Sequence, residues 1–293
     1  MLSLTDTMTA QAATAATKAR GTARPLAYLV QSMYGGAFIG VAVVLMFSAA
    51  GPLRAADSPW APLVQGLVFG VALTLVVAAG AELATSNMMT LTQGALRREL
   101  GWGRAGGTLA FSFLGNMAGA FVFGTMVHLT GLTAPTTAAG QMLAGVLEAK
   151  GHETVGQLFW RGVLCNALVC LAIWAGARMR SEVARLIVIF WCLLAFITSG
   201  FEHVVANMTT FALGLVGALP ETSWAAFAEN MVVVGLGNLV GGAVVIGAGY
   251  AYAAGRPTPV AAPVAAPVTT PVTAPVTAQA AQPAPEAVGA PRA

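Results

Sequence analysis

The sequence predicts an all-α membrane protein with six transmembrane helices in two inverted repeats of three, the second and fifth helices being broken. Three observations predict this fold: the composition, the spacing of the apolar stretches, and a motif that occurs twice. Of the 293 residues, 57% are hydrophobic and only 9% are charged, and the mean hydropathy is +0.76. Because a soluble domain carries about 25% charged residues, lipid must be the solvent for most of this chain.

The apolar stretches divide into four long ones and two short ones. A transmembrane helix needs about 20 apolar residues, and the long stretches, 28–50, 106–131, 155–177 and 224–253, meet that length. The short stretches, 62–80 and 186–199, are each followed by a polar interruption and a second apolar piece, 88–96 and 204–219 respectively. We therefore expect each short stretch and its second piece to form one broken span.

The Lys and Arg residues are distributed unequally between the two sides of this arrangement. With six spans, one side holds eleven of the 14, and the other holds only Arg54, Lys150 and Arg161. Cytoplasmic loops carry an excess of Lys and Arg, so both termini are expected in the cytoplasm. A miscounted span would destroy this asymmetry, which therefore supports six spans independently of hydropathy.

Three regions are expected along the chain. Residues 1–25 are rich in Ala and Thr, lack the pattern of a signal peptide, and are expected to form a loose cytoplasmic tail. Residues 26–255 form the six-span domain, with repeats at about 26–131 and 155–253. Residues 256–293 have Pro at every fourth position from 259 to 275. Such a segment, rich in Pro, Ala, Val and Thr, is expected to be a disordered cytoplasmic tail.

The motif Gly-x-Glu-x4-Asn-Met occurs at both interruptions. Its two copies begin at Gly80 and Gly200, an offset of 120 residues. A second motif, Gly-Asn-x-x-Gly, begins at Gly115 in the third span and at Gly237 in the sixth, an offset of 122 residues. Two copies of three spans must have opposite orientations, and inverted repeats with interrupted helices place a site near the bilayer midplane where the repeats meet.

The polar residues that both copies share are interpreted as scaffold. Glu82 and Glu202 lie where a helix has just ended, and a carboxylate there can accept hydrogen bonds from free backbone N–H groups. An ionisable residue at membrane depth is otherwise a functional hypothesis, but the symmetry favours loop bracing. Asn87 and Asn207 fall near the start of the second half-helices, where Asn is a good N-cap. The positive helix ends would then face inward, which suits an anion.

The two breaks differ at His203 and Thr85. His203 is the only histidine in a break and is matched by Leu83 in the first copy, while Thr85 is matched by Val205 in the second. Histidine titrates near neutrality and can donate a hydrogen bond or a proton, and a hydroxyl can donate without carrying a charge. A buried histidine is more often a packing residue, and a loop threonine often bonds to backbone. The asymmetry nevertheless leads us to expect that these two residues contact the substrate.

Four further polar residues are candidates. Lys150, on the outer side, would raise the local concentration of anions at a pore mouth, unless it is simply solvated. Asn116, Asn166 and Asn238 lie inside apolar spans and must find partners. Hydrogen bonding between helices is the structural alternative to lining a pathway.

Three segments resemble hallmark segments of the formate/nitrite transporter family. They are Gly80-Ala-Glu-Leu-Ala-Thr85, Val163-Leu-Cys-Asn166-Ala-Leu-Val-Cys170-Leu-Ala172 and Ser199-Gly-Phe-Glu-His203-Val-Val-Ala-Asn207-Met208. The resemblance covers residues from about 26 to 252. Within it, residues 190–200 and 207–213 are similar to the nitrite-carrying members more than to the formate-carrying ones.

The resemblance implies an aquaporin-like protomer in a homopentamer, with one pathway per protomer, in the cytoplasmic membrane of a prokaryote. The substrate it implies is a small monovalent anion, nitrite before formate or hydrosulfide. The pathway residues it implies are Thr85, the central His203, the external Lys150, Asn166 and Asn238, to which we add Asn207 for its place at a helix start. The hydrophobic constrictions would be Phe69 and Leu73 on one side of the histidine and Phe196 on the other. The family often has Phe at the position of Ala84, so this constriction is either wider or formed by Leu73 alone.

Two other classes of protein remain as alternatives. A neutral-solute channel of the aquaporin class would share the half-helices, but the sequence has no Asn-Pro-Ala motif. A membrane oxidoreductase would need paired intramembrane histidines for haem, and only His203 is expected to lie deep. No phosphate loop, zinc motif or nucleophile elbow occurs, so we expect no enzyme, cofactor, metal or nucleic-acid partner. The expected partners are the anion, membrane lipid and further copies of the chain.

Overall fold

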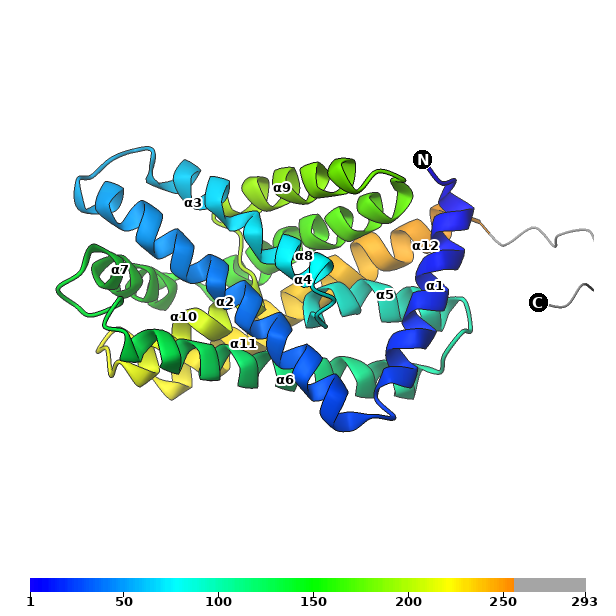
Figure 1. Cartoon of the computed structure of the whole chain (residues 1–293), viewed down its shortest axis with the longest axis horizontal. Coiled ribbons are helices and arrows are strands. Elements are labelled where there is room, and N and C mark those ends of the chain that lie inside the picture. Colours follow the sequence, from blue (N-terminus) through cyan, green and yellow to red (C-terminus); the bar gives the residue numbers. More distant parts are fainter. Residues whose placement is uncertain (256–293) are drawn as a thin grey trace, which may run out of the picture. The chain divides into compact units, whose positions relative to one another are not determined.

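Helices make up nearly all of the backbone that the structure describes (Figure 1). The structure is a computed structural model that describes residues 1–255, so the predicted tail 256–293 lies outside the described residues. The helices are α1 (Leu4–Gly21), α2 (Pro25–Ala55), α3 (Ala61–Phe69), α4 (Val71–Ala78), α5 (Ala84–Leu96), α6 (Trp102–Leu129), α7 (Ala138–His152), α8 (Val155–Arg178), α9 (Glu182–Thr198), α10 (Val204–Val216), α11 (Trp224–Leu239), the π-helix η1 (Val240–Ala248) and α12 (Gly249–Ala253). The prediction of an all-α chain is confirmed.

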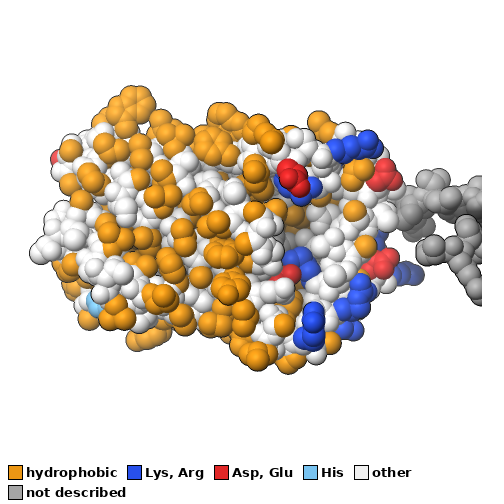
Figure 2. All heavy atoms as spheres, in the orientation of Figure 1, with side chains coloured by type: hydrophobic (Ala, Val, Ile, Leu, Met, Phe, Trp, Pro, Cys, Tyr) orange, Lys and Arg blue, Asp and Glu red, His pale blue; other side chains and the backbone are white. Residues whose placement is uncertain are grey.

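Five helical segments are long and apolar enough to cross a membrane by length and composition. They are Pro25–Ala55, Ala61–Ala78, Trp102–Leu129, Val155–Arg178 and Trp224–Ala253. The apolar helix α9 has 17 residues and is followed by the second break and α10. In Figure 2, hydrophobic side chains cover most of the visible face, and the Lys and Arg side chains gather toward the end where α1 and α12 lie. The chain is therefore an all-helical membrane protein.

The prediction of a loose tail over residues 1–25 is wrong, because most of this segment is helix α1. Ser3 caps the helix and accepts a hydrogen bond from the backbone N–H of Asp6 at 3.0 Å. Met8, Ala12 and Ala19 are buried on one face of α1, which packs mainly on α5. Small alanine side chains allow close packing while adding little hydropathy, which explains why hydropathy alone missed this helix.

Helix α7 was also not predicted. It connects α6 to α8 and packs mainly on α2. Thr137 caps it by accepting a hydrogen bond from the backbone N–H of Gly140 at 2.9 Å. The helix carries Lys150 in its last turn. The sequence had suggested a loop position for this lysine, which is wrong.

The two predicted breaks have the same backbone geometry. Gly80 and Gly200 follow the ends of α4 and α9 with φ of +73° and +69°, a region that residues with a Cβ adopt at a cost. Two residues later, the backbone N–H of Glu82 donates to the carbonyl of Gln31 at 3.1 Å. In the second break, the N–H of Glu202 donates to the carbonyl of Arg161 at 3.3 Å. Each break is thus attached to the helix that begins its half of the chain.

Asn116 of α6 stabilises the first break. Its Oδ1 accepts from the backbone N–H of Ala84 at 2.8 Å, and its Nδ2 donates to the carbonyls of Ser32 at 2.6 Å and Glu82 at 2.7 Å. One side chain therefore supplies two of the partners that the interrupted helix lacks, at Glu82 and Ala84, and ties the break to Ser32 of α2.

Asn238 of α11 does the same at the second break. Its Oδ1 accepts from the backbone N–H of Val204 at 2.9 Å, and its Nδ2 donates to the carbonyls of Gly162 at 2.8 Å and Glu202 at 2.9 Å. The two copies of the Gly-Asn-x-x-Gly motif thus carry the asparagines that satisfy the two breaks.

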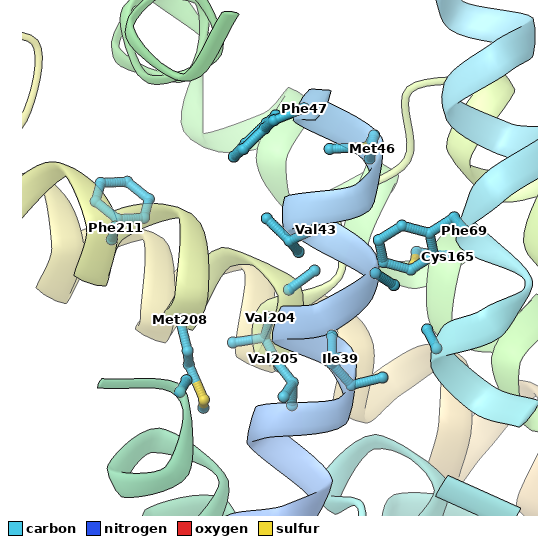
Figure 3. Close-up of a cluster of buried hydrophobic side chains, with 14 of the residues drawn as sticks. Ile39, Val43, Met46, Phe47, Phe69, Cys165, Val204, Val205, Met208 and Phe211 are labelled. Carbon is cyan, nitrogen blue, oxygen red and sulfur yellow. The ribbon is translucent and has the colours of Figure 1, made fainter. Parts of the chain in front are cut away.

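The second break leads directly into the apolar core. Val204 and Val205, at the start of α10, have no exposed surface and lie near Ile39 and Val43 of α2 (Figure 3). Backbone groups at this depth have no water to bond to. The bonds to Asn238 are therefore a condition for the break to exist at all.

We predict that Gly200→Ala lowers the free energy of unfolding by about 1–2 kcal/mol, because a Cβ disfavours the left-handed backbone. Nothing lies within 4 Å of the position a Cβ would take, so steric contact does not contribute. Gly106→Ala is the matched control, since Gly106 also has nothing within 4 Å but lies inside helix α6 without positive φ. Thermal unfolding in detergent should show loss for the first variant and none for the second; equal behaviour would contradict the prediction.

Candidate functional site

Two cavities and a small gap between apolar side chains contain most of the predicted site residues. The larger cavity, about 390 Å³, is lined by α1, the first break, α8 and α9; we call it the α1 cavity. The second, about 190 Å³, is lined by α2, α3, α7, α8 and the second break; we call it the α7 cavity. The gap has a volume of about 10 Å³, and we call it the central gap.

The central gap lies against His203. Its lining residues are Ile39, Phe69, Ala72, Leu73, Leu83, Val169, Leu193, Phe196 and His203. Phe69 and His203 also line the α7 cavity, so the gap adjoins that cavity directly. The α1 cavity shares no lining residue with the gap. In the described part of the chain, the α1 cavity and the gap are therefore separate.

The three predicted constriction residues lie together, but not in the expected grouping. Phe196 was expected on the far side of the histidine from Phe69 and Leu73. Instead, the rings of Phe69 and Phe196 make an edge contact with centroids 5.8 Å apart, and Phe196 stacks on the His203 ring at 6.0 Å. Leu73 lies one helical turn beyond Phe69, and Leu83 joins it in the gap. Sequence reasoning missed Leu83, which occupies the histidine's position in the first break.

His203 is itself the N-cap of α10. Its Nδ1 accepts a hydrogen bond from the backbone N–H of Ala206 at 3.1 Å. A neutral imidazole that accepts at Nδ1 carries its proton on Nε2, and Nε2 lies 3.0 Å from Oγ1 of Thr85. His203 then donates to Thr85, and the hydroxyl proton of Thr85 remains free to be donated onward. The sequence singled out both residues as substrate contacts, which stays a prediction; the structure adds that they bond to each other.

The sequence suggested that Asn87 and Asn207 are N-caps, but neither of them is. Helices α5 and α10 begin three residues before them, so each asparagine is the fourth residue of its helix. Each donates from Nδ2 to a glutamate of its own break, Asn87 to Glu82 at 3.0 Å and Asn207 to Glu202 at 2.6 Å. The Gly-x-Glu-x4-Asn spacing therefore encodes a hydrogen bond between side chains.

Glu82 accepts hydrogen bonds from side chains rather than from backbone N–H groups. Besides Asn87, its Oε2 accepts from Nζ of Lys18 at 2.7 Å and from the hydroxyl of Tyr28 at 3.4 Å. Lys18 comes from α1, within the segment that was expected to be loose. The one signal that could have indicated this role is the placement of a lysine among Ala and Thr residues.

Glu202 has the corresponding arrangement on the other side. Nζ of Lys150 lies 2.6 Å from both of its carboxylate oxygens, and the side chains are only 11% and 7% exposed. Asn207 also donates to Oδ1 of Asn230 at 2.8 Å. Lys150 is therefore bound to a carboxylate at the cavity wall and is not a free cation at the surface.

Asn166 and Asn238 line none of the described cavities. Both are fully buried. Asn166 donates from Nδ2 to the carbonyl of Thr85 at 3.1 Å and to that of Asn238 at 2.7 Å. The structural alternative for these residues, hydrogen bonding between helices, accounts for their contacts. Asn166 in addition positions Thr85.

One further ion pair lies at the α7 cavity. Arg161 donates to Glu153, which follows the end of α7. Partial burial and the negative charge of Glu202 raise the pKa of Glu153 above its ordinary value, against the opposing effect of Lys150 and Arg161. On acidification Glu153 therefore takes up a proton before an ordinary surface carboxyl does. Within residues 1–255, no group of three His, Cys, Asp or Glu side chains could hold a metal ion.

Two cavities separated by apolar side chains, in an all-helical membrane chain, are the arrangement of a membrane channel or transporter. The chain belongs to the formate/nitrite transporter family, whose sequence profile matches residues 5–252. This family membership confirms the resemblance inferred from the three hallmark segments.

Relatives named as nitrite transporters or formate channels support the assignment. The chain is 42% identical over 251 residues to the nitrite transporter NirC of Escherichia coli (strain K12), covering 85% of this chain and 92% of that one. It is 40% identical over 260 residues to NirC of Salmonella typhimurium, covering 87% and 95%. The formate channel FocA of Escherichia coli (strain K12) is 30% identical over 252 residues, covering 79% and 87%.

Solved structures agree with this assignment. An FNT family ion channel superposes with a TM-score of 0.80 at 40% identity, covering 85% of this chain and 99% of that one. A pentameric formate channel with formate bound has a TM-score of 0.68 at 25% identity, covering 78% and 97%. The fold of this chain is thus that of the family's channels.

We predict that His203→Ala destabilises the protein by about 1 kcal/mol through loss of the N-cap, and further through the cavity it leaves in a buried site. His203→Asn should recover the capping part, because the amide oxygen can accept from Ala206 N–H. Thermal unfolding of both variants in detergent tests this; an Asn variant no more stable than the Ala variant would show that the cap contributes nothing.

Proposed function

We propose that this protein conducts a small monovalent anion, with nitrite as the preferred substrate, between the α7 cavity and the α1 cavity through the central gap. The observation that carries the proposal is the hydrogen-bonded pair of Thr85 and His203. His203 lines a gap whose other lining side chains are all apolar, and Thr85 lies behind it, bonded to its Nε2. In an apolar barrier of this kind, the only useful partner for a partly dehydrated anion is a fixed donor. The Thr85 hydroxyl is that donor, and His203 sets its direction.

Selectivity follows from the cost of dehydration. An apolar gap removes water from an ion, and this cost is largest for small or multiply charged ions. A monovalent anion with diffuse charge loses less hydration and regains part of it from Thr85. The start of α10 contributes a positive helix end close to the same point. The closed gap described here must widen for passage, which the side chains of Phe69, Phe196 and Leu83 can do by rotation.

The sequence identities to named relatives favour nitrite over formate and hydrosulfide as the proposed substrate. The transporters named for nitrite share 40–42% of aligned residues with this chain, against 30% for the formate channel of Escherichia coli. Formate or hydrosulfide transport remains the competing proposal within the family.

The membrane arrangement we propose has six spans. The broken segments α3–α4 with α5, and α9 with α10, each count as one span, so the halves 26–131 and 155–253 are inverted copies with an aquaporin-like architecture. The excess of Lys and Arg on one side supports an orientation with both termini in the cytoplasm of a bacterial cell. A homopentamer with one pathway per protomer is supported by the pentameric formate channel of similar fold.

We predict that His203→Asn reduces nitrite flux in proteoliposomes about tenfold or more, because it keeps the helix cap but removes the Nε2–H donor that orients Thr85. Flux is measured beside wild type at equal protein density, with the His203→Ala protein included, and with and without an imposed pH gradient to detect proton coupling. Undiminished flux in both variants would rule out a central role for His203.

We also predict that wild-type proteoliposomes carry nitrite faster than formate and hydrosulfide at equal concentration. Empty liposomes correct for permeation of the neutral acids. A higher corrected rate for formate or hydrosulfide would reassign the substrate, whereas glycerol or water permeation without anion flux would favour a neutral-solute channel.

A further inference from the structure

The charged side chains of the α7 cavity do not balance. Three cations line it, Arg54, Lys150 and Arg161, against two carboxylates, Glu153 and Glu202. Lys150 is paired with Glu202, and Arg161 with Glu153. Arg54 takes part in none of the ion pairs found within residues 1–255. The net positive charge of this cavity therefore comes from Arg54.

The position of Arg54 leaves its guanidinium open to a ligand. It lies in the last turn of α2, with its Nη2 3.5 Å from the point that a Cβ on Gly145 of α7 would occupy. The nearest acidic residues along these two helices, Asp57 and Glu148, are exposed and do not line the cavity. The guanidinium thus lies against helix α7 at the cavity wall, without a carboxylate to neutralise it.

The same cavity extends from Arg54 to His203. Both residues line it, together with Phe69 at the edge of the central gap. An anion bound at Arg54 therefore needs to pass no further barrier before it reaches the gap. Lys150, which the sequence suggested for this capture role, is held by Glu202 and offers little net charge.

The α1 cavity has a parallel arrangement. Lys18 is paired with Glu82, as Lys150 is with Glu202. Arg185, at the start of α9, lines the cavity and uses its Nε to donate to the carbonyl of Gly176 at 3.2 Å. It too belongs to none of the ion pairs among the described residues. Each cavity therefore combines a lysine bound to the break glutamate with an arginine free of carboxylates.

We propose that Arg54 is the first anion-binding group of the α7 cavity, and Arg185 that of the α1 cavity, each binding a small anion with two oxygens before it reaches Thr85 and His203. This role rests on the proposed function. A guanidinium presents two parallel N–H donors that match two oxygens of one anion. Exposure to water keeps such binding weak, and conduction requires an anion that can leave as readily as it binds.

The test is nitrite flux in right-side-out and inverted membrane vesicles, measured against nitrite concentration and ionic strength. Arg54→Gln should raise the half-saturating concentration about two- to fivefold for nitrite supplied from the α7 side and leave the maximal rate unchanged. Its flux should also depend less on ionic strength, because the attracting charge is gone. Arg185→Gln should do the same from the α1 side only. Arg180→Gln, an exposed arginine outside both cavities, is the matched control and should leave both sides unchanged.

The Arg54→Lys variant distinguishes loss of the guanidinium from loss of folding, since it retains the charge and a long side chain. Its flux should keep the dependence on ionic strength, but its affinity for nitrite should fall in part, because an ammonium lacks the two parallel N–H donors of a guanidinium. Wild-type half-saturation in both Arg54 variants, with normal maximal rates, would overturn the role of Arg54 and leave the proposed function intact. An equal effect of Arg180→Gln would also overturn it, by showing a general effect of charge. Absence of anion flux in the wild-type protein would instead overturn the proposed function and this role with it.

Discussion

Backbone groups that a broken helix leaves without partners are the constraint on which this structure depends. At membrane depth such groups have no water to bond to, so each must be satisfied by the protein. Asn116 and Asn238 do this for the first and second break, each with one acceptor bond and two donor bonds to backbone. The half-helices can begin inside the protein only because these two amides are present. The cavities, the gap and the polar pair beside it all follow from where the half-helices begin.

Within this symmetric frame, the polar pair arises where the two breaks differ, at His203 against Leu83 and at Thr85 against Val205. The N-cap position of α5 is Leu83, whose side chain caps nothing and joins the apolar gap. The equivalent position of α10 is His203, which caps its helix and thereby fixes its own tautomer. The cap thus has two consequences, because the bond that stabilises the helix also determines which ring nitrogen faces Thr85. A protonated imidazole would have to give up that cap.

The sequence predicted the long apolar helices, both breaks and the family, because hydropathy and repeated motifs report these directly. It singled out Thr85 and His203 as the residues that differ between the breaks, but it did not predict the hydrogen bond between them. It did not predict α1, whose buried face is alanine and adds little hydropathy. It assigned Asn87 and Asn207 to caps because propensity favours them there, whereas the helices begin three residues earlier. It predicted that Lys150 is a free cation at a pore mouth, because no pattern along the chain connects Lys150 with Glu202, 52 residues away. Contacts between distant segments are the part that spacing alone cannot supply.

The two lysine–glutamate pairs bear on how the chain arose. Lys18 belongs to α1, which precedes the first set of three spans, and Lys150 belongs to α7, which precedes the second. Each reaches forward to the glutamate of the half that follows it, over 64 and 52 residues respectively. The ancestral unit implied by this correspondence is therefore longer than its membrane-spanning part. A gene duplication that copied a leading helix together with the helices that follow it would account for both lysines.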